Sequence, residues 1–135
     1  MSFEEMPHTA DIKIRAHAPT LETLFSEACE ALMQVMYGKE RRAVISAEID
    51  VDSSDTESLL ADFLSELLFR SEVDGMVFSE VVVRITGTHL HAVMQGEPFD
   101  RSRHAGGTEV KGISYSGMSV TQDTNGYMLE ILFDV

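Results

Sequence analysis

Apolar and polar residues follow two different periods along the chain. In residues 12–18 and 42–51 they alternate, which is typical of a strand with one buried face. In residues 20–36 and 58–68 apolar side chains recur every three or four positions, which is typical of an amphipathic helix. The first half of the chain is therefore predicted to run strand, helix, strand, helix.

Residues at the ends of the two helical segments support these assignments. Thr20 precedes the first segment as an N-cap, and Gly38 follows it as a C-cap. Residues 54–57, Ser-Asp-Thr-Glu, have the form of a capping box and are predicted to begin the second helix. The pair Asp74-Gly75 is predicted to end it.

The second half of the chain changes to a period of two. Five strands are predicted, separated by turns at residues 86–88, the loop 96–107, Ser116-Gly117 and residues 123–126; they cover 77–85, 89–94, 108–115, 118–121 and 128–135. The order is β-α-β-α-β-β-β-β-β. We expect an α+β fold with two helices packed on a mainly antiparallel β-sheet, one core and a single domain over residues 1–135.

Charge narrows the functional classes more than any other property of the composition. The formal net charge is −13 at pH 7. Such a polyanion repels phosphate backbones and anionic membrane surfaces, so we expect no direct nucleic-acid binding and no membrane binding. Cations and basic protein surfaces are the natural partners. Adaptation to solubility or high salt is the alternative interpretation.

The single cysteine, Cys29, excludes an internal disulfide framework and fits a reducing compartment. It lies within a helical apolar pattern, which predicts a buried small side chain rather than a nucleophile. The first residues lack the basic and apolar regions of a signal peptide. We expect a cytoplasmic protein.

The last residues place acidic groups at the end of an apolar strand. Asp134 is adjacent to the α-carboxylate of Val135, and crowded carboxylates require neutralisation. If Asp11 lies beside them on a neighbouring strand, three oxygen donors converge, which suits a hard divalent cation such as Ca²⁺, Mg²⁺ or Mn²⁺. The alternative is that Asp134 is a solvated residue at a strand end.

Other polar residues have two interpretations each. His8 could hold Asp11 by a hydrogen bond or satisfy backbone groups at a turn. Asp62 and Glu66, four residues apart on the second helix, could support a site or contact a partner, or form a solvated helix face. His89 and His91 share one strand face but lack a third ligand, so exposed strand histidines are favoured.

Cations are concentrated in one loop of this acidic chain. Arg101, Arg103, His104 and Lys111 lie within or directly after residues 96–107 and could contact an anion such as GTP phosphates or an acidic segment of a partner. They could equally balance nearby acidic side chains. No nucleophile elbow, phosphate-binding loop or paired cysteines are present, so the residues do not support an enzyme in its own right.

Five segments in order, spread over essentially the whole chain, resemble the archease family: His8-Thr-Ala-Asp11, residues 58–69, Gly96-Glu-Pro-Phe-Asp100, Val110-Lys111 leading to Ser114-Tyr115, and Phe133-Asp-Val135. The resemblance implies a non-catalytic accessory protein of the GTP-dependent RNA-splicing ligase. It would promote guanylylation of the ligase's active-site histidine and multiple turnover in tRNA splicing and maturation.

This resemblance also bears on individual residues. It covers Asp62 and Glu66, includes His8 in a matching motif, and places Lys111 on the family's functional strand, so Lys111 is favoured over Arg103 as a contact. GTP and tRNA are expected only through the ligase. A metal-dependent hydrolase that uses the same carboxylates, and a chaperone-like interaction module without a metal, remain the alternatives.

Overall fold

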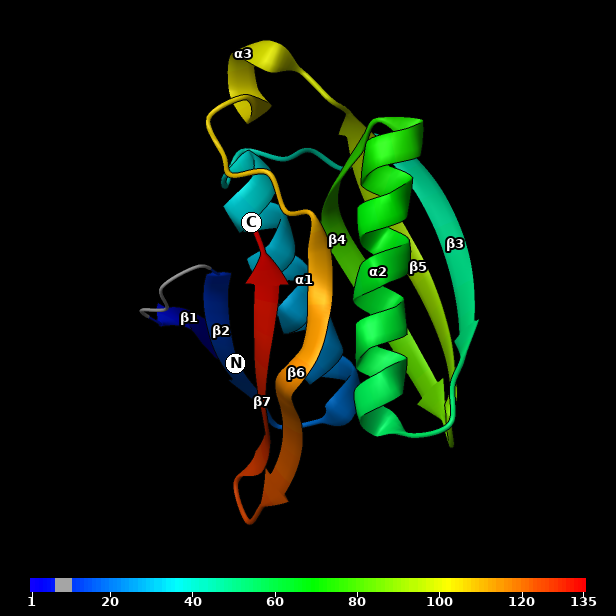
Figure 1. Cartoon of the computed structure of the whole chain (residues 1–135). Helices are drawn as coiled ribbons and strands as arrows, with labels where there is room; N and C mark the ends of the chain where they lie inside the picture. Colours follow the sequence, from blue (N-terminus) through cyan, green and yellow to red (C-terminus); the bar gives the residue numbers. More distant parts are fainter. Residues whose placement is uncertain (7–10) are drawn as a thin grey trace.

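A computed structural model describes residues 1–6 and 11–135 of the chain. Within these residues the elements are β1 Ser2–Met6, β2 Asp11–Ala18, α1 Leu21–Tyr37, β3 Ile45–Asp52, α2 Thr56–Asp74, β4 Met76–Thr86, β5 His89–Pro98, α3 Arg101–His104, β6 Gly112–Asp123 and β7 Gly126–Asp134. Figure 1 shows their arrangement along the chain.

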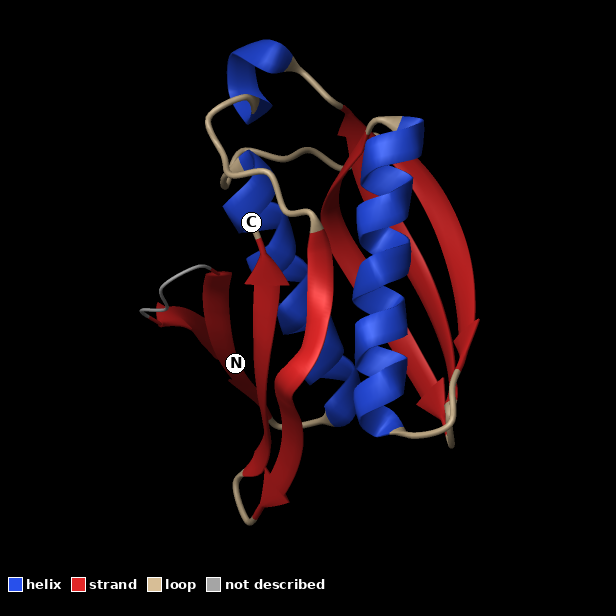
Figure 2. Ribbon diagram, viewed as in Figure 1, coloured by secondary structure: helices blue, strands red, loops and turns tan. Residues whose placement is uncertain are grey.

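The strands form two antiparallel sheets, in the order β1-β2-β7-β6 and β3-β5-β4. The α+β class is therefore confirmed, but the expectation of one sheet is wrong. Helix α1 packs on β2 and β7 of one sheet and on β4 of the other, while α2 packs on β6 and on the three-stranded sheet (Figure 2). Both helices bury side chains on more than one side, which a single sheet face cannot cover.

Buried side chains from both helices and both sheets form one apolar cluster. Cys29 belongs to it at 3% exposure, and burial raises the pKa of its thiol to about 12, as expected for a packing residue. Among the described residues, no helix has the length and hydropathy required to cross a bilayer.

Side-chain capping defines the ends of the helices. The Thr20 hydroxyl accepts a hydrogen bond from the Thr23 amide at 3.2 Å, and Gly38 with φ +83° ends α1, as predicted. The N-cap of α2 is Asp55 rather than Ser54, because the Asp55 carboxylate accepts from the Ser58 amide at 2.8 Å. Gly75, left-handed at φ +65°, ends α2 as expected.

Two strands differ from the sequence-based assignment. Strand β1 was not predicted, since Ser2–Met6 shows no regular alternation, yet it pairs with β2 along its whole length. The turn predicted at Ser116-Gly117 is an irregularity within a continuous β6, where the register with β7 shifts between Ser114 and Ser119. The extra residues are accommodated as a bulge, with Gly117 at φ +73°.

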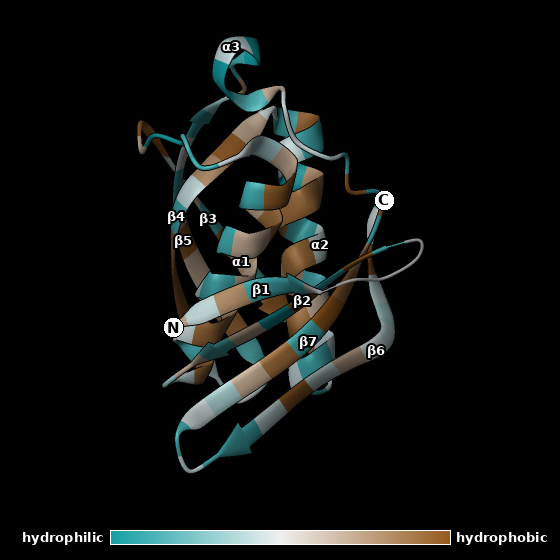
Figure 3. Cartoon of the chain, turned by 90° about the vertical axis from the view of Figure 1, so that its left-hand side faces the viewer, coloured by the Kyte–Doolittle hydropathy of each residue, from teal (hydrophilic) through white to brown (hydrophobic). Residues whose placement is uncertain are grey.

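Alternation in β7 determines which residues face solvent at its end. Leu129, Ile131 and Phe133 are fully buried, so Asp134 lies on the outer face of the sheet. Figure 3 shows that β7 is hydrophobic along much of its length. Because β7 lies between β2 and β6, its last residues have a neighbour on each side.

Candidate functional site

Asp11 and Asp134 lie directly opposite one another, as the first residue of β2 and the last of β7. In antiparallel strands a residue and its direct partner project to the same face, with Cβ atoms about 5 Å apart. On the other side of β7 the partner of Asp134 is Gly112, the first residue of β6. Three strand ends therefore meet here, as Figure 1 shows at the upper end of the sheet, and two of them carry a carboxylate.

This arrangement concentrates negative charge. Like charges directly opposite on neighbouring strands are destabilising. Asp134 is exposed, and no described residue donates a hydrogen bond to its carboxylate or forms an ion pair with it. A Cβ at position 112 would lie 3.5 Å from the Asp134 Oδ2 atom, so glycine leaves the space beside this oxygen free. The site can accommodate a cation.

Side chains alone supply two of the three predicted ligands. In the described part of the chain, no group of three His, Cys, Asp or Glu side chains is arranged to hold a metal ion. The third predicted ligand is Val135, whose oxygen atoms belong to the backbone; the residue is 39% exposed and follows Asp134 directly. The metal site therefore stays a prediction, with Asp11 and Asp134 as its side-chain ligands and Val135 as a backbone ligand.

Lys111 lies at the same group of strand ends. Its backbone N–H donates to the Asp134 carbonyl at 2.6 Å, and the preceding Val110 is fully buried. These contacts fix the backbone of Lys111, whereas its side chain is exposed and forms no ion pair with a described residue. An unpaired ammonium on a fixed backbone is available for an external anion.

Asp62 and Glu66 take part in contacts within the fold. The Asp62 carboxylate accepts hydrogen bonds from the Tyr115 hydroxyl at 2.7 Å and from the Ser53 hydroxyl at 2.5 Å. The hydrogen bond to Asp62 raises the pKa of Tyr115. Glu66 pairs with Arg70 at 3.0 Å, one helical turn away. Neither carboxylate belongs to the Asp11–Asp134 pair. In the sequence analysis Tyr115 was named only as part of a matching segment, and its contact with Asp62 was not predicted.

Arg103 is directed into the protein. Its guanidinium donates to both carboxylate oxygens of Glu97, at 2.7 and 2.5 Å, and to Asp100 at 3.0 Å. Glu97 is 4% exposed and also accepts from the Arg42 amide at 2.6 Å. The hydrogen bonds from Arg103 hold the pKa of Glu97 near 2. For Arg103, charge balancing is the interpretation that the structure favours.

His104 also belongs to the interior of this loop. The Asp100 amide donates to its Nδ1 atom at 2.9 Å, so Nδ1 carries no proton. Its Nε2 atom then donates to the Glu40 carbonyl at 3.0 Å. The imidazole is buried, both ring nitrogens have partners within the protein, and Nε2 also lies 3.4 Å from the Glu97 carboxylate. His104 is therefore not available to bind an external phosphate.

The remaining histidines divide into two cases. His89 and His91 project from β5 toward acidic residues of β3, and Asp50 lies 3.2 and 3.0 Å from their ring nitrogens. Asp52 lies 2.8 Å from His89 and raises its pKa. Both are strand histidines on a solvent-facing side of the sheet, which is the interpretation that the sequence favoured. The predicted role of His8 lies outside the described residues.

The similarity to known proteins extends over almost the whole chain. Residues 3–135 match the Archease protein family (MTH1598/TM1083). The chain is 36% identical to the archease of Methanopyrus kandleri over all of both chains, and 34% identical to that of Pyrococcus furiosus over 98% of each.

Solved structures give the same result. The solution structure of Methanobacterium thermoautotrophicum protein 1598 superposes with a TM-score of 0.82 and 26% identity, covering 99% of each chain. The Thermotoga maritima archease has the same fold, with a TM-score of 0.68 and 18% identity over 98% of this chain and 96% of that one. The chain belongs to the archease family.

Proposed function

We propose that this protein is a non-catalytic accessory factor of the GTP-dependent RNA-splicing ligase. It promotes guanylylation of the ligase's active-site histidine and repeated turnover in tRNA splicing and maturation. Membership of the archease family supports this role. The observation that carries the proposal is the pairing of Asp11 with Asp134, where two carboxylates face each other beside a glycine.

The residues at this position fit a divalent cation. The carboxylates of Asp11 and Asp134 and the backbone oxygen of Val135 are hard donors of the kind that Ca²⁺, Mg²⁺ and Mn²⁺ prefer. A bound cation would add positive charge that could neutralise phosphate charge at the ligase's GTP site. The carboxylates hold their position through the pairing of β2 with β7, which requires no rearrangement of the chain.

Lys111 and the overall charge have separate roles in this proposal. The ammonium of Lys111, unpaired among the described residues, approaches the phosphates from the same group of strand ends. The net charge of −13 accelerates docking on the basic RNA-binding surface that such a ligase needs. The negative charge of the whole protein directs its approach to the ligase, and the residues at the strand ends then act on the GTP phosphates.

Exposed apolar side chains favour a protein partner. Phe69, Val73 and Phe99 are 55%, 64% and 46% exposed. Phe99 and Glu72 line a groove of about 570 Å³. Tyr37, which also lines it, lies 6.0 Å from Phe99 between ring centroids. The Thermotoga maritima protein is described as a possible chaperone, and this surface supports a chaperone-like interaction module as the second candidate function.

Purified ligase, GTP and the untagged protein distinguish these functions. We expect guanylylated ligase to accumulate faster when the protein is present, and no release of phosphate from GTP by the protein alone. Phosphate release without ligase would instead support a metal-dependent hydrolase. Recovery of misfolded ligase without any effect on guanylylation of folded ligase would support the chaperone-like function.

A further inference from the structure

A groove with aromatic walls lies where the two long helices end, close to α3 in Figure 1. Its volume is about 570 Å³. The end of α1 lines it with Met36 and Tyr37, and the last turn of α2 lines it with Glu72. The remaining lining residues belong to residues 99–109. Three segments that are far apart in the sequence therefore form one surface, which we call the helix-end groove.

Phe99 is supported from two sides although 46% of it is exposed. Its backbone N–H donates to the Gly75 carbonyl at 2.8 Å. Its ring centroid lies 6.0 Å from that of Tyr37 and 5.9 Å from that of the buried His104. An exposed ring that its neighbours already hold loses little conformational entropy on binding, which is typical of anchor residues in protein interfaces.

The charges around the helix-end groove favour a cation. Both long helices end here, and the C-terminal end of a helix carries partial negative charge. Neither last turn contains a basic residue that would offset this charge. Glu72 and Glu109 line the groove, and neither forms an ion pair within the described part of the chain. Against these two negative charges, the lining holds the positive charge of Arg101.

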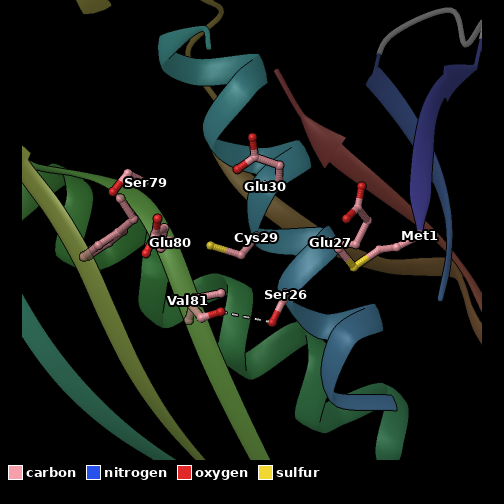
Figure 4. A pocket seen from close by; sticks show the side chains of 9 residues that line it. Met1, Ser26, Glu27, Cys29, Glu30, Ser79, Glu80 and Val81 are labelled. Atoms are coloured by element: carbon pink, nitrogen blue, oxygen red, sulfur yellow. Dashed lines mark hydrogen bonds between the residues drawn. The ribbon is translucent and has the colours of Figure 1, made fainter. Parts of the chain in front are cut away.

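The other acidic hollow of the molecule is different. A pocket of about 340 Å³ between α1 and β4 contains three carboxylates, from Glu27, Glu30 and Glu80 (Figure 4). There Glu30 pairs with Arg41, so part of the negative charge is offset within the fold. The aromatic residue of that lining, Phe78, is only 1% exposed. Exposed rings together with unpaired carboxylates therefore distinguish the helix-end groove.

This combination selects one class of cation. A guanidinium is planar, stacks on aromatic faces and can donate two parallel hydrogen bonds to a carboxylate, whereas an ammonium is a compact and strongly hydrated charge. Burial raises the pKa of Tyr37, and the negative charge of Glu72 adds to this shift, so the carboxylate lies close to the aromatic wall. A ring and a carboxylate in one groove match a guanidinium.

The surface beside the groove indicates a polypeptide rather than a small molecule. Phe69 and Val73 are one helical turn apart on α2 and are 55% and 64% exposed. They stand on either side of Glu72 in the sequence, so they extend the apolar surface beyond the groove. A single small ligand in the groove would leave them uncovered.

We propose that the helix-end groove binds an arginine side chain of a partner protein, in a segment that has apolar residues on both sides of the arginine. The guanidinium stacks on Phe99 and pairs with Glu72, and the apolar neighbours contact Phe69 and Val73. The proposal shares the interaction surface of the second candidate function and is independent of a cation at the strand ends.

The test is an NMR titration of the untagged protein with acetylated and amidated peptides Leu-Ala-X-Ala-Leu, in which X is arginine, lysine or citrulline. We expect the arginine peptide to shift the amide signals of residues 36–38, 69–75 and 99–109. Citrulline has the shape of arginine without its charge, so its peptide should bind about tenfold more weakly. The lysine peptide should also bind more weakly than the arginine peptide, because an ammonium does not stack on a ring.

Substitutions locate the binding surface. Glu72→Gln and Phe99→Leu should each lower the affinity for the arginine peptide by about threefold. Phe99→Leu keeps an apolar side chain against Tyr37 and removes the aromatic face, and thermal unfolding verifies that both variants fold. Glu80→Gln is the matched control, since it removes an exposed carboxylate outside the groove and should leave the affinity unchanged.

The same titration in EDTA and in CaCl₂ separates this surface from the strand-end site, and we expect equal peptide affinities. The proposal is overturned if the arginine and citrulline peptides bind equally, or if the lysine peptide binds more tightly than the arginine peptide. It is also overturned if Glu80→Gln weakens binding as much as Glu72→Gln, if binding requires Ca²⁺, or if no groove signal shifts at millimolar peptide.

Discussion

Two charged regions at the same end of the molecule have opposite arrangements. In the α3 loop, Arg103 binds Glu97 and Asp100, and His104 is enclosed by backbone groups. At the strand ends, Asp134 and Lys111 have side chains without a described partner. From the sequence, the cations of the loop could either contact an anion or balance nearby acidic side chains.

The difference separates charges that maintain the fold from charges available for binding. A guanidinium that already binds two carboxylates cannot bind a phosphate without leaving a buried carboxylate unpaired. Backbone hydrogen bonds fix Asp134 and Lys111, while their side chains have no partner among the described residues. Function is therefore expected where backbone contacts alone hold charged residues in place.

The largest effect is expected from removing either strand-end carboxylate. Asp11→Ala and Asp134→Ala should each lower ligase stimulation by about 100-fold or more, because a cation site with two side-chain ligands does not survive the loss of one. Guanylylation of the ligase is the measurement, and circular dichroism should show an unchanged fold. Glu48→Ala, which removes one carboxylate from the outer sheet edge, is the matched control. Full stimulation by either aspartate variant would remove the carboxylate site.

Arg103→Ala should lower the stability of the fold and leave ligase stimulation almost unchanged. Without Arg103 the buried Glu97 keeps one backbone hydrogen bond, so the melting temperature should fall by about 10 °C. Below that temperature, ligase stimulation should remain close to that of the wild type. A loss of stimulation at full stability would show that the loop contacts the ligase.

The pH dependence of unfolding tests the same loop. Arg103 lowers the pKa of Glu97 to about 2, and Ser102, followed by Arg103, lowers that of Asp100 to about 2. Depressed carboxylate pKa values stabilise the fold above the unfolded-state values and lose that contribution as pH falls through the folded-state values. Stability of the wild type should therefore decline between about pH 4.5 and pH 2. In Arg103→Ala this decline should be shallower, which acid-denaturation curves of the two proteins can show.

Lys111→Ala should have a smaller effect, a decrease in stimulation of about threefold to tenfold with unchanged divalent-cation affinity. The reason is that its ammonium acts on the ligand of the partner and not on the carboxylates. Arg101→Ala is the control, since Arg101 is an exposed cation of α3 without a described ion-pair partner. If Arg101→Ala has the larger effect, the contact surface is the loop rather than the strand end.

A further prediction concerns cation affinity and Val135. A polypeptide that ends at Val135 offers a carboxylate there, whereas one with residues added after Val135 offers a neutral amide. The extended protein should therefore bind divalent cations about tenfold more weakly while it keeps the fold. Calorimetric titration of proteins extended at either end is the measurement. Equal affinities would mean that Val135 supplies at most a carbonyl oxygen.

Local patterns in the sequence predicted much of the fold. The periodicity and the caps at Thr20, Gly38 and Gly75 placed α1 and the end of α2, because these features act within a few residues. The division into two sheets could not be predicted in this way, since it depends on how both helices bury several sides at once. Strand β1 owes its conformation to its pairing with β2.

The candidate site was only partly predictable for the same reason. From the sequence, the proximity of Asp11 to Asp134 was only a condition, and the register of β2 with β7 shows that the two residues are direct partners. The contact of Tyr115 with Asp62 depends on the bulge in β6, and the burial of Arg103 depends on the packing of α3. Neither contact could be predicted from residues that are close together in the sequence.

Calorimetric titration of Mg²⁺ and Ca²⁺ into the untagged wild type, Asp134→Asn and Arg103→Lys tests most directly whether the strand ends hold a cation. Asp134→Asn keeps the shape of the side chain and removes its charge. We predict saturable binding of one cation by the wild type and by Arg103→Lys, and a loss of binding in Asp134→Asn. The proposal is contradicted if the wild type binds no divalent cation, or if Asp134→Asn binds it as tightly as the wild type.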